Sequence, residues 1–97
     1  MLEDFTLETF SGRLGETFRV GEGADAFDLE LVEAIAGIAR PHAGGRVPFS
    51  LVFHGPLEPV LPQRIYPFEH AELGTFDLFI VPLGPDDGHM QYEAVFG

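Results

Sequence analysis

Apolar and polar residues alternate with a period of two over most of the chain from Thr17 onward. The apolar residues form short blocks separated by glycine and proline, which is typical of β-strands joined by turns. The blocks that predict strands cover residues 17–20, 27–34, 49–54, 64–70, 75–81 and 90–96. The chain is therefore predicted to be mainly β, with about six strands.

The segment before these strands, Thr6 to Gly15, has a different period. Leu7, Phe10 and Leu14 recur at helical spacing, with Thr6 at the N-cap position and Gly15 as a stop signal. One short N-terminal helix that buries these three side chains is predicted. An irregular turn that buries the same side is the alternative, because a glycine within the segment lowers its helix propensity.

The second strand contains an irregularity in its alternation. Leu29 and Leu31 point to one face, but Glu33 occupies the position where the next inward residue belongs. One extra residue near Leu31 would restore the inward positions to Val32 and Ala34, so a β-bulge is predicted there. Burial of this strand on both sides is the alternative.

Three later features predict how the strands are arranged. Pro67 cannot donate to a neighbouring strand, so the strand 64–70 is predicted to lie at an edge or to carry its proline outward. Phe79 and Val81 make both faces of the next strand apolar, which predicts a strand covered on each side or one that crosses into a second layer. The segment 84–88 (GPDDG) predicts a hairpin that pairs the last two strands antiparallel.

These strands must bury their apolar faces against each other, because no long helix is available to cover a flat sheet. A small antiparallel barrel is favoured over a two-sheet sandwich, since a barrel leaves no long open edges and a bulge favours curvature. A chain of 97 residues is expected to form one core. Residues 1–97 are therefore predicted to be a single β domain.

Charge and composition narrow the function classes. Five arginines and no lysine face sixteen carboxylates, and the formal net charge is -11. Binding to nucleic acid or to an anionic membrane is not expected, because both depend on cationic side chains. Ten phenylalanines among 45% hydrophobic residues predict a folded chain. The lack of cysteine excludes a disulfide framework, a thiolate zinc site and a cysteine nucleophile.

The first residues indicate where the chain is made. Met1 is followed by a leucine and two acids, which is unlike the basic start of a signal peptide. The apolar runs are far shorter than the roughly 20 residues that span a bilayer. A soluble protein made in the cytoplasm is expected.

The residues that could carry chemistry are scattered. His42, His54, His70 and His89 lie in four different segments without a metal-ligand spacing, so no metal and no cofactor are predicted. Ser50 and His54 share a strand face, but four residues along a strand span about 13 Å, too far for a direct dyad. An enzyme is not expected. A hydrolase that uses Ser50, His54 or His70 with a carboxylate is the least favoured reading.

One stretch lacks acidic residues altogether, from Ala34 through Leu57, and it includes a predicted surface loop over 37–48. Its candidate contact residues are Arg40, His42, Arg46 and His54. A glycine- and proline-rich loop that simply lacks acids is one reading. The other is a surface that contacts an acidic partner protein or the acidic face of another copy.

Several segments resemble a known family. They are PFSLVFHGP (48–56), LPQRIYPFEHAELGTFDLFIVPLGP (61–85) and YEAVF (92–96), with TLETF and LGETFRV near the start. The chain resembles, over nearly its whole length, a small bacterial family of uncharacterised single-domain proteins. Its members have no assigned activity and are often encoded beside proteins with phage tail-collar domains of the microcystin-dependent type. The resemblance implies an accessory role in a tail-like or extracellular fibre-like assembly, and no functional residue carries over.

Together these observations predict a non-enzymatic interaction or assembly module, accessory to a tail-collar-like or fibre-like protein. The sheet surface or the loop from Arg40 to Arg46 would make the contact, with a contribution from the hairpin around Asp86. Self-association is left open. The alternative is a small-ligand-binding barrel, whose predicted lining residues are Tyr66, Phe68, Phe79 and Tyr92.

Overall fold

The computed structural model describes residues 5–21, 23, 26–37, 48–58 and 60–96. Its elements are, in chain order, α1 (Leu7–Ser11), β1 (Thr17–Val20), β2 (Phe27–Ala36), β3 (Phe49–Gly55), β4 (Arg64–His70), β5 (Gly74–Asp86) and β6 (His89–Phe96). The predicted strands are all present, and β1 and β4 have the predicted bounds. Arg40, His42 and Arg46 lie outside the described residues, so their role in partner contact stays a prediction.

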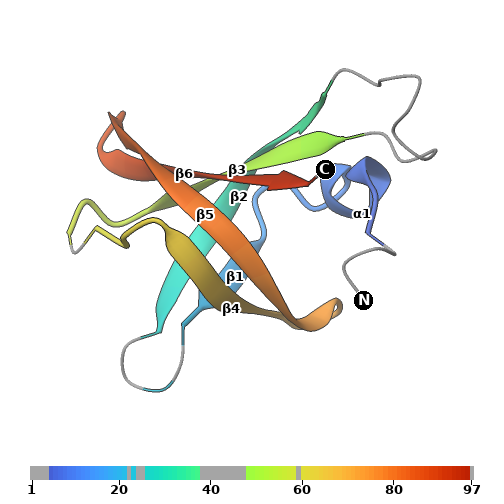
Figure 1. Cartoon of the computed structure of the whole chain (residues 1–97), viewed down its shortest axis with the longest axis horizontal. Coiled ribbons are helices and arrows are strands. Elements are labelled where there is room, and N and C mark those ends of the chain that lie inside the picture. The colour runs from blue at the N-terminus through green and yellow to red at the C-terminus, as the bar shows by residue number, and fades with distance from the viewer. Residues whose placement is uncertain (1–4, 22, 24–25, 38–47, 59, 97) are drawn as a thin grey trace.

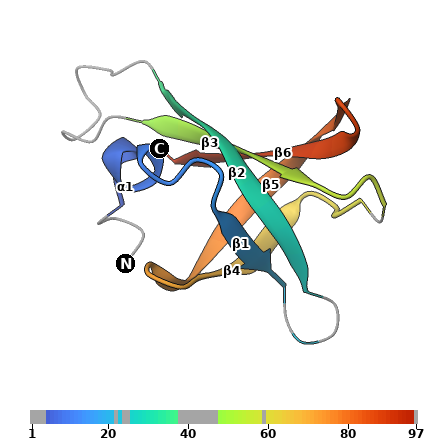
Figure 2. The ribbon, with the colours of Figure 1, turned by 180° about the vertical axis from the view of Figure 1, so that it is seen from behind.

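The six strands form one closed antiparallel barrel in the order β1-β2-β3-β6-β5-β4. β1 to β3 form one meander and β4 to β6 form another, and the two are joined by the β3–β6 and β1–β4 pairs. Figures 1 and 2 show the two halves crossing around a common interior. The predicted barrel is confirmed, and the alternative of two stacked sheets is excluded.

The two junctions between the meanders differ in length. The β3–β6 junction is paired from Phe49–Phe96 to Gly55–Met90. Among the described residues the β1–β4 junction has the pairs Arg19–Glu69 and Val20–Phe68, followed by a hydrogen bond from the Gly21 N–H to the Pro67 carbonyl at 2.9 Å. Paired strands therefore form a long junction between β3 and β6 but only a short one between β1 and β4.

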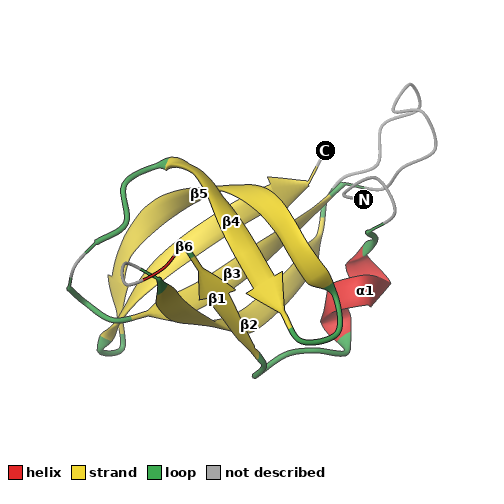
Figure 3. Cartoon of the chain, turned by 90° about the horizontal axis from the view of Figure 1, so that it is seen from below, coloured by secondary structure: helices red, strands yellow, loops and turns green. Residues whose placement is uncertain are grey.

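Phenylalanines fill the interior. Phe10, on α1, is fully buried, and α1 lies at one end of the barrel (Figure 3). The ring of Phe10 lies 5.3 to 6.5 Å, between centroids, from the rings of Phe5, Phe18, Phe49, Phe76 and Phe96. Aromatic rings at these separations attract one another beyond the gain from burial. The helix therefore closes the end of the barrel by inserting Phe10 into the core.

The helix is shorter than its sequence pattern. The main-chain N–H of Thr6 donates to Oγ1 of Thr9 at 3.0 Å, which satisfies a donor at the helix start. Gly12 is the C-cap, so Leu14 lies beyond the helix and is 52% exposed. The prediction that Leu14 is buried is wrong, because the helical period stops before it.

The structure tests two predicted irregularities of the strands, the bulge in β2 and the position of Pro67 in β4. The register of the β2–β3 pair shifts between Leu31 and Glu33, which confirms the bulge. Val32 is half-buried, and Ala34 packs against the core. Pro67 lies on the outer face between the buried Tyr66 and Phe68. β4 is not an edge strand, since β1 and β5 flank it, so only the outward proline is confirmed.

The predicted cover over the outer face of β5 is wrong. Phe76, Leu78 and Ile80 point inward, but Phe79 points outward and is 48% exposed. A closed barrel has one interior, and Phe79 lies on the other face of its strand. The predicted hairpin is confirmed, because Asp87 and Gly88 both have positive φ angles, 49° and 83°. None of the helices in the described part of the chain has the length and hydropathy needed to cross a membrane.

Candidate functional site

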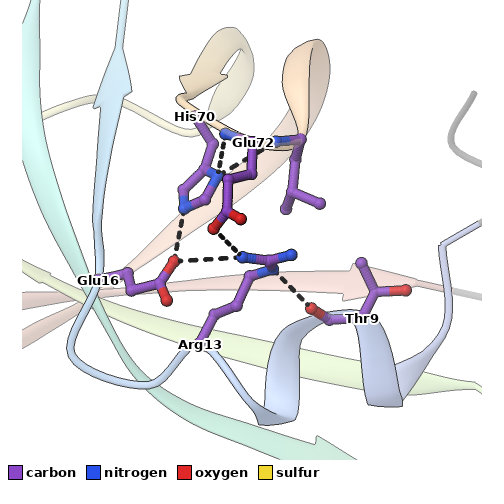
Figure 4. Close-up of polar contacts among 6 residues, drawn as sticks. Thr9, Arg13, Glu16, His70 and Glu72 are labelled. Carbon is purple, nitrogen blue, oxygen red and sulfur yellow. Dashed lines mark hydrogen bonds and ion pairs between the residues drawn. The ribbon is translucent and has the colours of Figure 1, made fainter.

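A cluster of polar side chains lies beside α1, where the β1–β4 pairs end (Figure 4). Arg13 and Glu16 come from the segment between α1 and β1, His70 ends β4, and Glu72 lies in the following turn. The main chain fixes Glu16, since its carbonyl accepts from Leu31 N–H at 3.0 Å and the neighbouring Gly15 N–H donates back to Leu31 at 2.7 Å. These backbone bonds hold Glu16 next to His70.

His70 is the buried centre of this cluster, with 7% of its surface exposed. Its Nδ1 atom accepts hydrogen bonds from the main-chain N–H groups of Glu72 and Leu73, at 3.1 and 3.2 Å. Because a backbone N–H can only donate, Nδ1 is unprotonated, and in the neutral ring the proton is on Nε2. Nε2 lies 2.6 Å from Oε1 of Glu16 and therefore donates to it.

Arg13 joins the helix to the same turn. Its Nη1 atom lies 2.7 Å from Oε1 of Glu72 and 3.6 Å from Oε1 of Glu16, and its Nε donates to the carbonyl of Thr9 at 3.2 Å. The hydrogen bond to Glu72 raises the pKa of the Arg13 guanidinium above its usual value. The guanidinium stays charged and connects α1 to the β4–β5 turn.

The cluster contains three side chains of metal-binding type, since ligand atoms of Glu16, His70 and Glu72 lie within 4.8 Å of one another. Two features argue against a metal ion there. The cation between the two carboxylates is already Arg13. A metal-bound imidazole also normally donates an N–H from its second nitrogen, but Nδ1 of His70 accepts two N–H groups instead. The geometry fits a structural role, in which side chains connect distant segments of the chain. We call Arg13, Glu16, His70 and Glu72 the latch.

The hydrolase candidates are brought together only in part. His70 has its carboxylate partner in Glu16, but the described contacts of the latch include no hydroxyl of Ser50. Ser50 and His54 lie on the outer face of β3, alternating with the buried Leu51 and Phe53. Nothing in this arrangement points to catalysis.

His54 has a neighbour that sequence spacing did not reveal. Its ring lies 5.3 Å from the ring of His89, centroid to centroid, with 16° between the planes. The β3–β6 pairing explains this, because Gln91 lies opposite His54 and His89 is two residues before Gln91. The predicted hairpin fixes only the β5–β6 register, so no pattern in the sequence indicated this contact between β3 and β6.

The four aromatic residues that were predicted to line a ligand pocket do not share one surface. Tyr66, Phe68 and Tyr92 lie in the core, whereas Phe79 is outside it. The Tyr66 hydroxyl donates to the Pro62 carbonyl at 2.8 Å, and the Tyr92 hydroxyl accepts from Leu61 N–H at 2.9 Å. Both hydroxyls therefore hold the segment before β4, and the prediction that Phe79 joins the other three rings is wrong.

Exposed apolar side chains form a band across the outer surface of the barrel. We define the apolar band as Ile35, Val95, Phe79 and Ile65, which are between 46% and 66% exposed. Ser50 pairs with both Ile35 and Val95, and Ile65 pairs directly with Phe79. Phe79 and Val95 each lie two residues from the Val81–Glu93 pair. The four members of the band therefore lie on β2, β6, β5 and β4, and the polar Ser50 of β3 lies between Ile35 and Val95.

Acidic residues border this band. Glu33, Glu93 and Asp77 each lie two positions along a strand from a member of the band, on β2, β6 and β5 respectively. Residues two apart on a regular strand share a face. The band is therefore apolar at its centre and negatively charged at its border.

A comparison with protein-family models matches nearly the whole chain. A family model described as a domain of unknown function (DUF6916) matches residues 5–96. No curated protein and no solved structure matches the chain. The match covers the helix and all six strands of the barrel.

Proposed function

Since the chain belongs to the DUF6916 family of domains of unknown function, we propose its role from its surface: it is a non-enzymatic interaction module that binds another protein through the apolar band. The observation that carries the proposal is the row of four exposed apolar side chains, on β2, β6, β5 and β4, across the outer face of an acidic domain. Contiguous exposed apolar surface rimmed by polar residues is typical of protein contact sites.

The closed barrel restricts how such a contact is made. A partner strand needs an open sheet edge to add to, and each of the six strands already has two neighbours. Contacts must therefore come from side chains on the outer face. Phe79 supplies an aromatic side chain, and such side chains contribute strongly to interface energies.

The negative charge of the surface indicates which kind of partner fits it. Two copies of a chain with a net charge of -11 repel each other, which opposes self-association through a face bordered by acids. A partner with an apolar patch and a basic rim fits both the band and its border. We propose such a protein as the occupant. The resemblance described above makes a tail-collar-domain protein the first candidate, with a tail-like or fibre-like assembly as the setting.

Co-expression with a tail-collar-domain protein, followed by size-exclusion chromatography, tests the proposal. We expect the two proteins to elute together. A Phe79→Ser and Val95→Ser double variant should elute separately from the partner, while Leu14→Ser, which changes an equally exposed residue outside the band, should still co-elute.

One outcome would contradict the choice of partner, and another would contradict the place of the contact. Separate elution of the unaltered proteins at micromolar concentration would contradict this choice of partner. Co-elution of the double variant would show that the contact lies elsewhere, for example at the loop with Arg40 and Arg46.

A further inference from the structure

We propose that His54 and His89 bind one divalent transition-metal ion, with zinc as the expected biological ion. The site lies on the outer surface, at the end of the barrel where the β5–β6 hairpin turns. It is separate from the latch and from the apolar band, and it does not depend on the proposed function.

The first argument is the distance between the rings. Two imidazoles bound to one zinc ion, with Zn–N bonds of about 2.0–2.1 Å and tetrahedral angles, have ring centroids about 5 Å apart. The centroids of His54 and His89 are 5.3 Å apart. The ring planes are nearly parallel, with 16° between them, so one or both side chains must rotate to place one nitrogen of each ring on a shared ion.

The second argument is the chemistry of the neighbours. Glu30 lies directly opposite His54 on β2, and Asp86 lies directly opposite His89 on β5. Directly opposed residues point to the same face of a sheet. The order across four neighbouring strands is therefore carboxylate, imidazole, imidazole, carboxylate. Both carboxylates are exposed and can turn toward an ion held by the imidazoles.

The third argument is that these imidazoles are available. Among the described residues, His54 and His89 have each other as ring neighbours, and their nitrogens take part in no hydrogen bond or ion pair. This is the reverse of His70, whose two nitrogens are both used. Zinc, copper and nickel ions accept neutral imidazole with carboxylate, whereas calcium and magnesium require oxygen ligands.

Calorimetric titration with zinc chloride at neutral pH, together with NMR of the histidine rings, tests the site. We expect saturable binding of one ion, with the ring signals of His54 and His89 shifting and those of His70 unchanged. His54→Ala or His89→Ala should weaken binding at least tenfold. Magnesium chloride should give no signal.

The matched control is Glu33→Gln, which removes an exposed carboxylate from β2 outside the row and should bind zinc as the unaltered chain does. Glu30→Gln and Asp86→Asn together should weaken binding, because they remove the oxygen ligands. Thermal unfolding without zinc should show that the histidine variants stay folded, and zinc should raise the melting temperature of the unaltered chain and of Glu33→Gln but not of the histidine variants. Absence of saturable binding, or undiminished binding by a His54→Ala and His89→Ala double variant, would overturn the proposal.

Discussion

Nε2 of His70 lies 2.6 Å from Oε1 of Glu16, and this contact continues the closure of the barrel where the β1–β4 backbone pairs end. The last pair before it is Arg19–Glu69, and the ring of Phe18 lies 4.6 Å from that of His70. The latch therefore does with side chains what hydrogen-bonded strand pairs do elsewhere in the barrel.

Replacing His70 with alanine should lower the free energy of unfolding by about 1–3 kcal/mol, because two main-chain N–H groups and Glu16 lose their buried partner. Urea unfolding followed by circular dichroism measures this change. His89→Ala, at an exposed ring, is the control and should change stability little. Equal losses in the two variants would contradict a closing role for His70.

The tautomer of His70 is a separate prediction. At neutral pH the ring should carry its proton on Nε2, since Nδ1 accepts from Glu72 and Leu73. Nitrogen-15 NMR distinguishes a protonated from an unprotonated ring nitrogen. A proton found on Nδ1 would contradict the described hydrogen bonds.

Replacing Arg13 with alanine should lower the melting temperature more at low salt than at high salt. Arg13 contacts Glu72 at 2.7 Å and Glu16 at 3.6 Å, and screening weakens such exposed pairs. Calorimetry at two salt concentrations measures the difference. Arg19→Ala is the matched control, because Arg19 has one distant partner, Asp28 at 3.6 Å, and should have a smaller effect.

Replacing Gly55 with alanine should lower the free energy of unfolding by about 1–3 kcal/mol. A Cβ atom at this position would overlap Cδ2 of Leu29, which is fully buried and has little freedom to move away. Chemical denaturation gives the value. Gly12→Ala is the control, since a Cβ there meets no atom within 4 Å and the backbone φ is negative. A loss as large in Gly12→Ala would show that overlap with Leu29 is not the cause.

Replacing Phe10 with alanine should cost about 3–5 kcal/mol, because a fully buried ring leaves a cavity among the other rings. Phe10→Leu, which retains much of the volume, should cost less and stay folded. Phe79→Ser should cost less than about 1 kcal/mol, since Phe79 stabilises the barrel mainly through its pair with Ile65. Denaturation of the three variants compares them, and a larger loss for Phe79→Ser than for Phe10→Leu would contradict the assignment of inner and outer faces.

Much of the barrel follows from local pattern. The period of two gives the bounds of β1 and β4, and the misplaced Glu33 gives the bulge, because burial of one face forces regular alternation. Phe79 shows the limit of this reasoning. An apolar residue at an outward position has the same pattern whether a second layer covers it or solvent does, and only the closure of the barrel decides.

The sites depend on pairing between distant segments. Glu16 and His70 are 54 residues apart, and no spacing motif connects them. The contact of His54 with His89 depends on the β3–β6 register, and it lies beside a hairpin whose own register shifts between Pro82 and Gly84. Sequence spacing identifies such residues as candidates but does not bring them together.

The strand order also has a consequence for synthesis on the ribosome. β6 lies between β3 and β5 in the barrel. The longer junction, between β3 and β6, therefore cannot form fully until the chain has been synthesised as far as Phe96. Until Phe96 has emerged from the exit tunnel, β3 has an unpaired edge, and unpaired strand edges promote aggregation. A nascent chain stalled before β6 should therefore recruit chaperones, and one extended past Phe96 should release them.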